Sequence, residues 1–382
     1  MPTQTLIRSA RIVSSGRVLD NGWVLFDDDR IAAVGQGDTF PSDAALTVVD
    51  AAGRWLTPGF IDLHCHGGGG TAFDAGEDAI RTALAVHRRH GTTRSVLSLV
   101  TAAVPDLERE LAVIADAVRG DPLILGSHLE GPFLDDGHRG AHDPSLLRAA
   151  DPDSVERMLA AAAGTLVQVT LAPELPGGMA ALRQFVDASV AVAVGHCGAG
   201  YDESRAAFDA GASILTHAFN AMPGIHHRAP GPVAAAMDTP GVTLELVNDG
   251  VHVHPSVVRL AFEGAADRIA LITDAMAAAG SVDGEYQLGS LRVEVVDGVA
   301  RLAGGGSIAG STLTLDSALR LAVTSVGLPI EVAVRALTET PARAIGRGGD
   351  LGQLATGFAA DAVLLDSDFT VDAVWGAGRR LV

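Results

Sequence analysis

The hydrophobic and polar positions of the chain follow two different patterns. Up to about residue 50, short apolar runs alternate with turn signals, as in TLIRSARIVSSG and GRVLDNGWVLFDDDRIAAVG. Runs of this kind predict antiparallel strands joined by tight turns. After Pro58, strand-like segments alternate with stretches such as EDAIRTALAVHRRHG and DLERELAVIADAVRG. Their apolar residues recur at helical spacing, so these stretches predict amphipathic helices.

Eight strand candidates alternate with helices in this second region: FIDLHCH, TTRSVLSLVT, LILGSHLE, LVQVTLAP, VAVGHCG, SILTHAFN, VTLELVNDG and IALITDAM. This rhythm is typical of a parallel (β/α)8 barrel, although a doubly wound open sheet shares it. Several strand candidates end in a polar residue: His64, His66, Glu130, His196, His217 and Asp274. A closed barrel gathers strand ends around one mouth, whereas an open sheet spreads them along an edge, so we expect the α/β barrel.

The segments outside the barrel predict a second, smaller domain. After the eighth strand come a hairpin, EYQLGSLRVEVVDGVARLAGGG, and two helices, STLTLDSALRLAVTSVG and IEVAVRALTETPARAIG. The tail, GQLATGFAADAVLLDSDFTVDAVWGAGRRLV, returns to short strands. We expect it to pair with the N-terminal strands. The predicted domains are a small β-sandwich from residues 1–55 and 346–382 and a (β/α)8 TIM barrel from residues 56–345.

Composition and charge restrict the class of protein. The most apolar window, MLAAAAGTLVQVTLAP, is interrupted by Gly164, Gln168 and Thr170, so we expect no membrane span and no membrane partner. The N-terminus lacks the apolar run of a signal peptide, and two cysteines suit a reducing compartment, so we expect a cytoplasmic protein. The net charge of −19 argues against nucleic acid as a partner.

The chain contains no lysine, because all 27 residues counted as Lys and Arg are arginine. This excludes a Schiff-base mechanism and a lysine-attached pyridoxal cofactor. It also excludes a P-loop lysine and a metal centre bridged by a carboxylated lysine.

The run PGFIDLHCHGGGG, from Pro58 to Gly70, contains the clearest chemical signal. Side chains two apart on a strand share a face, so Asp62, His64 and His66 are expected to face the same way. Two imidazoles at this spacing can chelate a metal ion. The glycines that follow predict open space above the two histidines.

Histidines and carboxylates at strand ends suit a divalent transition ion, and zinc first among them. Two histidines with Glu130 would bind one ion and leave a position for water, while His64, His66 and Asp274 would hold a second. Zinc lowers the pKa of bound water to about 7, which gives hydroxide near neutral pH. Asp274 would accept the proton and return it to the leaving group. These residues predict hydrolysis of an amide or of a ring C–N bond.

The run PGFIDLHCHG, together with ITDAM and GQLATGFAADAVLL, resembles the amidohydrolase superfamily. Within it, HLEGPF, GAHDP, GHCGAG, THAFNAMPGIHHRAPG, NDGVHV and GSIAGSTLTL resemble the N-acetylglucosamine-6-phosphate deacetylases over nearly the whole chain. That family hydrolyses the acetamide of N-acetyl-D-glucosamine 6-phosphate, an amino-sugar phosphate, to D-glucosamine 6-phosphate and acetate. The resemblance therefore implies a metal-dependent deacetylase.

The resemblance also implies residue roles. The metal ligands would be Glu130, His196 and His217, Asp274 would be the general base and acid, and His142 would polarise the acetamide carbonyl. Family members differ at H-x-H, and because this chain keeps both histidines, we expect a site able to hold two ions. Substrate contacts are implied for Ala141, His142, Asn220, Ala221, Arg228, Asp249, His252, Ile308, Ala309 and Gly310.

The resemblance assigns the phosphate group to Arg228, His252 and the backbone at Asn220–Ala221. In family dimers this arginine reaches the neighbouring active site, so we expect a homodimer. The arginine would supply positive charge locally to an anionic substrate in an acidic protein.

Alternatives remain at this stage. The chain could be another metal-dependent amidohydrolase, such as a D-aminoacylase, or a non-catalytic barrel used as a binding module. A cyclic-ureide hydrolase would need the carboxylated lysine. His128 shares the face of Glu130 and is a candidate to support the ligands, while His138 and His227 have no assigned role. Cys65 and Cys197 are expected to pack in the interior.

Overall fold

The computed structural model of the protein describes residues 4–40, 46–304 and 306–382. The chain forms two compact units. One consists of Met1–Asp62, His87–Arg94 and Leu315–Val382, and the other of Leu63–Val86 and Ser95–Thr314. The two units are described one after the other.

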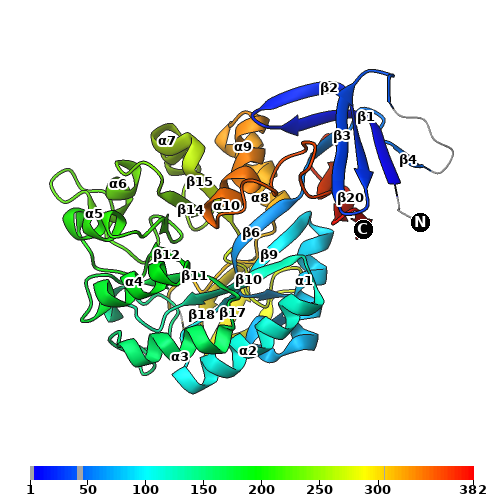
Figure 1. Cartoon of the computed structure of the whole chain (residues 1–382). Helices are drawn as coiled ribbons and strands as arrows, with labels where there is room; N and C mark the ends of the chain where they lie inside the picture. Colours follow the sequence, from blue (N-terminus) through cyan, green and yellow to red (C-terminus); the bar gives the residue numbers. More distant parts are fainter. Residues whose placement is uncertain (1–3, 41–45, 305) are drawn as a thin grey trace. The chain divides into compact units, whose positions relative to one another are not determined.

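The first unit contains an eight-stranded sheet in the order β21-β20-β19-β5-β1-β2-β3, with β4 paired to β1 (Figure 1). Its strands are β1 Gln4–Ser14, β2 Arg17–Asp27, β3 Arg30–Gln36, β4 Thr47–Asp50, β5 Trp55–Pro58, β19 Ala362–Leu365, β20 Val371–Gly376 and β21 Arg379–Arg380. Strand β19 runs antiparallel to β5, with Ala362 opposite Pro58. The tail therefore pairs with the N-terminal segment, as predicted. Apolar side chains of both segments, including Phe26, Leu56 and Trp375, share one core.

Three helices complete the first unit. They are α8 Leu315–Leu321, which continues as a π-helical turn over Ala322–Val326, α9 Ile330–Leu337 and α10 Glu339–Ala344. Helix α9 packs against β1. The buried face of α9 includes Ala333, Val334 and Leu337, whose spacing is the amphipathic pattern seen in the sequence.

Eight parallel strands form the sheet of the barrel, paired in sequence order. They are β6 Phe60–Cys65, β9 Thr92–Leu99, β10 Ile124–Glu130, β11 Leu166–Leu171, β12 Ala191–Val194, β13 Ile214–Leu215, β14 Thr243–Val247 and β15 Ile269–Ile272. The first and last strands meet: the Asp274 amide donates to the His64 carbonyl at 2.8 Å, and the His66 amide to that of Ala275 at 2.7 Å. The sheet is therefore nearly closed, which confirms the predicted barrel over the open sheet.

Helices follow most of the barrel strands. They are α1 Glu77–Arg89, α2 Val104–Gly120, α3 Pro152–Ala162, α4 Gly178–Asp187, α5 Tyr201–Asp209, α6 Gly231–Met237 and α7 Pro255–Ala265, with short 3-10 turns at Phe73–Ala75, Asp136–His138 and Ala266–Arg268. Helices α2 and α3 lie side by side and α2 also contacts β10 (Figure 1). Helix α2 buries Leu107, Leu111 and Ile114. Among the helices of the described ranges, none is both long and apolar enough to cross a membrane.

Two small antiparallel sheets are added to the barrel. Strands β16 Gly284–Leu288, β17 Leu291–Val296 and β18 Val299–Leu302 form the predicted excursion after the eighth barrel strand. The glycine run folds into a hairpin of β7 Gly67–Gly68 and β8 Thr71–Ala72.

The hairpin explains the four consecutive glycines. Gly69 and Gly70 form the turn with φ values of 64° and 88°, the left-handed region that glycine adopts most easily. A Cβ atom at Gly67 would lie 2.3 Å from the Thr71 carbonyl oxygen. The glycines therefore serve a tight turn, and our expectation that they leave open space above the histidines was wrong.

Candidate active site

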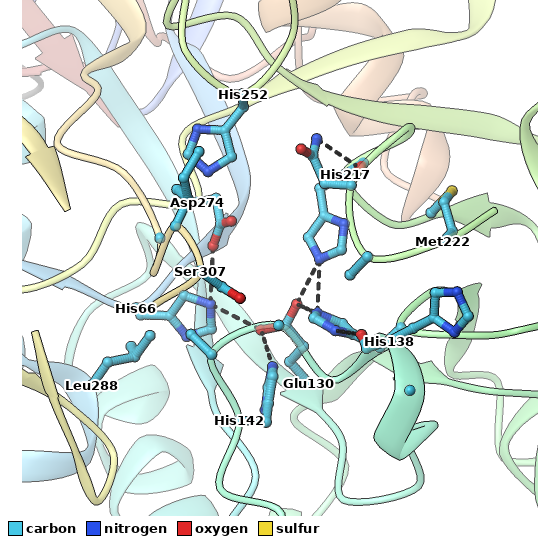
Figure 2. A pocket seen from close by; sticks show the side chains of 18 residues that line it. His66, Glu130, His138, His142, His217, Met222, His252, Asp274, Leu288 and Ser307 are labelled. Carbon is cyan, nitrogen blue, oxygen red and sulfur yellow. Dashed lines mark hydrogen bonds and ion pairs between the residues drawn. The ribbon is translucent and has the colours of Figure 1, made fainter. Parts of the chain in front are cut away.

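Glu130, the last residue of β10, lies at the centre of the predicted metal site. Its Oε1 atom is 3.1 Å from both His196 Nε2 and His217 Nε2. Its Oε2 atom is 3.2 Å from His66 Nε2. Figure 2 shows His66, His142 and His217 turned toward this carboxylate from different sides of the cavity. The structure thus brings together side chains from strands far apart in the sequence.

His64 and Asp274 lie beside this group. His64 Nε2 is 3.0 Å from His66 Nε2 and 3.3 Å from Glu130 Oε1. Asp274 Oδ1 is 3.3 Å from His66 Nε2 and 3.5 Å from His64 Nε2. All six predicted ligands are buried, and they form one cluster.

Three of these residues have an unusual backbone conformation. His196, His217 and Asp274 each stand two positions after the last residue of a barrel strand, with φ values of 47°, 27° and 49°. A positive φ costs a residue with a Cβ atom about 1–3 kcal/mol, and such conformations cluster at functional sites. The strand ends are therefore shaped for these side chains at an energetic cost.

The donor set fits divalent cations. His196 Nε2 and His217 Nε2 are 2.9 Å apart, and two imidazole nitrogens approach this closely only when a proton or a cation lies between them. In two groups, His64, His66 and Glu130, and Glu130, His142 and His196, all ligand atoms lie within 4.8 Å of one another. Imidazole with carboxylate oxygen is a ligand set for a transition ion. Glu130 belongs to both groups, as a bridging carboxylate would.

The protonation states agree with this interpretation. Burial alone would lower the pKa of His66, but its bonds to Asp274 and Glu130 raise it to about 9. Burial would raise the pKa of Asp274, yet the neighbouring His64 and His66 hold it well below its ordinary value. Burial would also raise the pKa of Glu130, but His64, His142 and His196 hold it well below its ordinary value. Carboxylates kept ionised beside histidines favour a bound cation, whose arrival releases the histidine protons.

His142 is held in a different state from the other histidines. Its Nδ1 atom is 2.9 Å from Thr101 Oγ1 and accepts the Thr101 backbone N–H at 3.4 Å. Burial lowers the pKa of His142 to about 4, so the ring is neutral near pH 7. With Nδ1 as an acceptor, the proton sits on Nε2, which lies 3.4 Å from Glu130 Oε2. His142 can therefore donate a hydrogen bond to a substrate oxygen.

Thr101 is a site residue that the sequence analysis missed. It stands two positions after β9 ends, as His196, His217 and Asp274 do after their strands. This position, two residues past the end of a barrel strand, was the signal in the sequence by which Thr101 could have been found.

Two histidines without a firm prediction also support the site. The carbonyl oxygen of His138 accepts a bond from His196 Nδ1 at 2.9 Å, which leaves Nε2 of His196 facing Glu130. His128 bonds Ser98 and Thr170 at 2.9 and 2.8 Å, and its ring packs edge-on against His64 with centroids 4.6 Å apart. His128 is thus part of the buried polar layer against which His64 packs.

A cavity of about 390 Å3 opens at this cluster (Figure 2). The predicted residues on its wall are His66, Glu130, Ala141, His142, His196, His217, Asn220, Ala221, His252, Asp274, Ile308 and Gly310. The others are Gly137, His138, Gly140, Met222, Leu288 and Ser307, which we did not predict. Gly140 allows a close approach, because a Cβ atom there would lie 3.3 Å from the His196 ring.

Four predicted site residues are absent from the described wall of this cavity. His64 lies fully buried below it, and Ala309 is also fully buried. Asp249 accepts a bond from His252 Nδ1 at 2.6 Å, so it acts on the cavity through that ring. Burial would lower the pKa of His252, but Asp249 raises it. Arg228 is exposed, on the loop between β13 and α6.

The fold and the site together define a class of protein, the (β/α)8 barrel enzymes with a cluster of potential metal ligands at the C-terminal ends of the strands. Comparison with known families narrows this class. Residues 55–381 match the model of the Amidohydrolase family. The chain belongs to the amidohydrolase family and, within it, to the N-acetylglucosamine-6-phosphate deacetylases.

Several relatives support this membership. The chain is 39% identical to an N-acetylgalactosamine-6-phosphate deacetylase of Escherichia coli O157:H7, over 98% of both chains. It is 37% identical to an N-acetylglucosamine-6-phosphate deacetylase of Vibrio furnissii, over 85% of this chain and 82% of the relative. A solved structure of a Mycobacterium smegmatis N-acetyl-D-glucosamine-6-phosphate deacetylase mutant, in complex with N-acetyl-D-glucosamine-6-phosphate, is 45% identical over all of both chains, with a TM-score of 0.94.

Proposed function

We propose that this protein hydrolyses the acetamide of N-acetyl-D-glucosamine 6-phosphate to D-glucosamine 6-phosphate and acetate. The observation that carries the proposal is the cluster of histidines around Glu130, which adjoins Asp274 and the neutral His142 in one cavity. Relatives that share most of the chain's length carry the name of this activity.

The proposed cofactor is a divalent metal ion, with Zn²⁺ as the first candidate and one or two ions per subunit. Glu130, His196 and His217 would hold the first ion. His64, His66 and Glu130, with Asp274 beside them, would hold the second. When bound, such an ion polarises a carbonyl oxygen and activates a water molecule for attack.

The chain's own residues would handle the protons. The lowered pKa of Asp274 keeps its carboxylate ionised near pH 7, so it can accept the proton of the attacking water. The acid that forms can then protonate the departing amine nitrogen. His142 Nε2–H would donate to the amide oxygen, where negative charge grows as the carbon becomes tetrahedral.

The phosphate end of the substrate requires positive charge from elsewhere. Of the described residues that line the cavity, none is an arginine. Among the predicted phosphate contacts on its wall, His252 is the cation candidate, because Asp249 raises its pKa. A phosphate ester carries about −1.5 to −2 charges at pH 7. We propose a homodimer in which Arg228 of each subunit reaches the active site of the other.

Exposed apolar side chains in the segments that carry Arg228 and His252 support this dimer. Ile225, three positions away, is 54% exposed, and Val251, next to His252, is 43% exposed. An apolar surface of this kind beside a charged residue suits an interface between subunits. Two buried free cysteines support a place in the cytoplasm, where thiols stay reduced.

A second candidate substrate is N-acetyl-D-galactosamine 6-phosphate. The relative that is 39% identical over 98% of both chains carries the name of that activity. The two sugars differ in the configuration of one hydroxyl group, so the same cluster and the same phosphate contacts would serve both.

The test is a deacetylation assay in which metal content is measured on the same sample. We expect turnover of N-acetylglucosamine 6-phosphate to greatly exceed that of N-acetylglucosamine, loss of turnover after chelation, and its recovery with Zn²⁺. A parallel assay with N-acetylgalactosamine 6-phosphate ranks the two sugars. Equal turnover with and without the phosphate would favour a D-aminoacylase-like enzyme. A protein that no divalent ion activates would be a non-catalytic barrel.

A further inference from the structure

A buried glutamate stands behind one of the metal ligands. Glu245, on β14, is completely buried. Its Oε2 atom is 3.3 Å from His64 Nδ1. Its Oε1 atom accepts a bond from Gln168 Nε2 at 2.7 Å, and Gln168 is completely buried on β11. The three side chains form a connected row across the barrel interior.

Such a carboxylate is costly in a protein core. Burying an ionised group is strongly unfavourable unless it is paired and hydrogen-bonded. An apolar side chain would fill the same space more cheaply, so packing alone does not account for Glu245. Its placement is explained if the carboxylate acts on His64.

The bond to Glu245 determines how His64 meets its neighbours. An ionised carboxylate only accepts hydrogen bonds, so His64 Nδ1 must carry the donated proton. The opposite nitrogen, Nε2, then faces His66 Nε2 at 3.0 Å and Glu130 Oε1 at 3.3 Å. This is the arrangement in which a carboxylate orients a histidine and increases its basicity toward a metal ion.

The other ligands have no comparable support. His196 Nδ1 bonds the neutral carbonyl of His138. Within the described part of the chain, Nδ1 of His66 and Nδ1 of His217 have no hydrogen-bond partner. A buried carboxylate therefore stands behind His64, one of the two histidines that belong only to the group of the second ion.

We propose that Glu245 is the positioning residue for the second metal ion, and that its bond to His64 decides whether the group His64, His66 and Glu130 binds a cation. The inference rests on the metal site of the proposed function. It concerns ion binding only, so it can fail while the deacetylase activity stands.

The experiment counts and titrates Zn²⁺ on the full-length protein without substrate. Protein stripped with a chelator is titrated with Zn²⁺, and bound metal is measured by mass spectrometry. We expect two ions per wild-type chain. Glu245→Met, which keeps the side-chain length but removes the acceptor, should weaken the second ion about 10–100-fold and leave the first unchanged. Glu245→Asp, which keeps a carboxylate, should lose less affinity for the second ion than Glu245→Met.

Two controls separate positioning from packing. Gln168→Met disturbs the same buried row but leaves the bond between Glu245 and His64, so both ions should remain. In a His64→Asn background, Glu245→Met should cause no further loss of the second ion. If Glu245→Met does not fold, Glu245→Asp is compared with wild type instead.

Several results would overturn the proposal. One is a wild-type chain that holds a single ion at saturating Zn²⁺. Another is an unchanged affinity for the second ion in Glu245→Met, or in Glu245→Asp if only that variant folds. Equal weakening of both ions by Glu245→Met would also overturn it. Absence of turnover on the sugar phosphate would refute the proposed substrate but would leave the ion count as the test of Glu245.

Discussion

At the scale of single residues, Glu130 is the most connected side chain of the site. Nε2 atoms of five histidines lie within 3.4 Å of its two carboxylate oxygens: His64, His196 and His217 at Oε1, and His66 and His142 at Oε2. One of them, His142, differs from the rest because its Nδ1 accepts the backbone N–H of Thr101. The same carboxylate therefore lies next to four proposed metal ligands and one neutral hydrogen-bond donor.

Replacing Asp274 tests the proposed proton carrier. Asp274→Asn keeps the shape of the side chain but cannot accept the proton of water. We expect kcat to fall roughly 10²–10⁴-fold or more, the size of a lost general base. Calorimetry should still detect binding of the sugar phosphate, and mass spectrometry should still find the ion of Glu130, His196 and His217. A variant that kept half of the wild-type kcat would exclude this role.

Replacing His142 tests the proposed oxyanion donor. His142→Ala removes the Nε2–H group, and we expect kcat to fall roughly 10²–10³-fold, as when one donor to an oxyanion is lost. KM should change little, because the bond strengthens mainly in the transition state. Thr101→Val, which leaves the ring but removes the hydroxyl at Nδ1, should have a smaller effect of the same sign. A raised KM with normal kcat would place His142 in substrate binding instead.

At the scale of one element, helix α2 carries two glutamates in opposite environments. Glu108 pairs with Arg157 of α3 at 2.7 Å, and this guanidinium lowers the pKa of Glu108. Glu110 is half-buried, and burial, with the charges of Asp74 and Asp106 and despite Arg109, raises its pKa to about 7. The helix therefore contains one carboxylate that favours the folded state when ionised and one that opposes it.

This contrast predicts a pH-dependent stability. An unfolded glutamate has a pKa of about 4.3, so between there and pH 7 the folded chain binds more protons at Glu110 than the unfolded chain. The stability linked to Glu110 is complete below about pH 4.3 and is lost as pH rises through 7. We expect Glu110→Gln to raise the melting temperature, and to raise it more at pH 8.5 than at pH 5.5.

Glu108→Gln is the matched control on the same helix. Because the folded pKa of Glu108 is lowered, its contribution is present above about pH 4.3 and is lost only below that. Melting temperatures of this variant should lie below wild type by a similar amount at pH 5.5 and 8.5. If the melting temperature of Glu110→Gln also differed from that of the wild type by the same amount at both pH values, the raised pKa of Glu110 would be refuted.

At the scale of the whole molecule, a single chain has an incomplete set of charges for its proposed substrate. The exposed Arg228 and the cavity lined by His252 are separate features of one subunit. The homodimer and the domain boundaries at residues 55 and 346 stay predictions. The homodimer can be tested by asking which subunit's Arg228 serves which active site.

Mixing two impaired variants tests the shared site. Arg228→Ala should raise KM for the phosphorylated sugar strongly, about tenfold or more, with little change in kcat, because a charge-assisted contact to phosphate is lost. Asp274→Asn has very little turnover but keeps its arginine. In a heterodimer of the two, the Arg228→Ala subunit would receive Arg228 of the partner subunit. We expect a component of activity with the wild-type KM to appear on mixing.

The controls for this experiment are kinetic and hydrodynamic. Each variant alone should sediment as the wild-type dimer does. A KM that stays raised after subunit exchange would mean that Arg228 serves its own chain. An unchanged KM in Arg228→Ala would remove this residue from the phosphate site altogether.

Local pattern predicted much of the fold and of the site. The β-strand and helix periodicities placed all eight barrel strands, because alternation along a short segment depends only on neighbouring residues. The polar residues at the strand ends could be chosen because a barrel brings such ends together. The H-x-H pair, His64 and His66, was recognisable because two residues on one strand share a face.

Contacts between distant segments had no such local signal. No spacing in the sequence links Thr101 to His142 or Glu245 to His64, 181 positions away. The glycine run could equally have been a loop that makes room for a ligand, and only the pairing of β7 with β8 decided that it is a hairpin. The sequence alone determined which elements form and which side chains can bind a metal ion. The tertiary structure decided which of them meet, because partner choice in a buried site depends on three-dimensional proximity and on pairing every buried polar group.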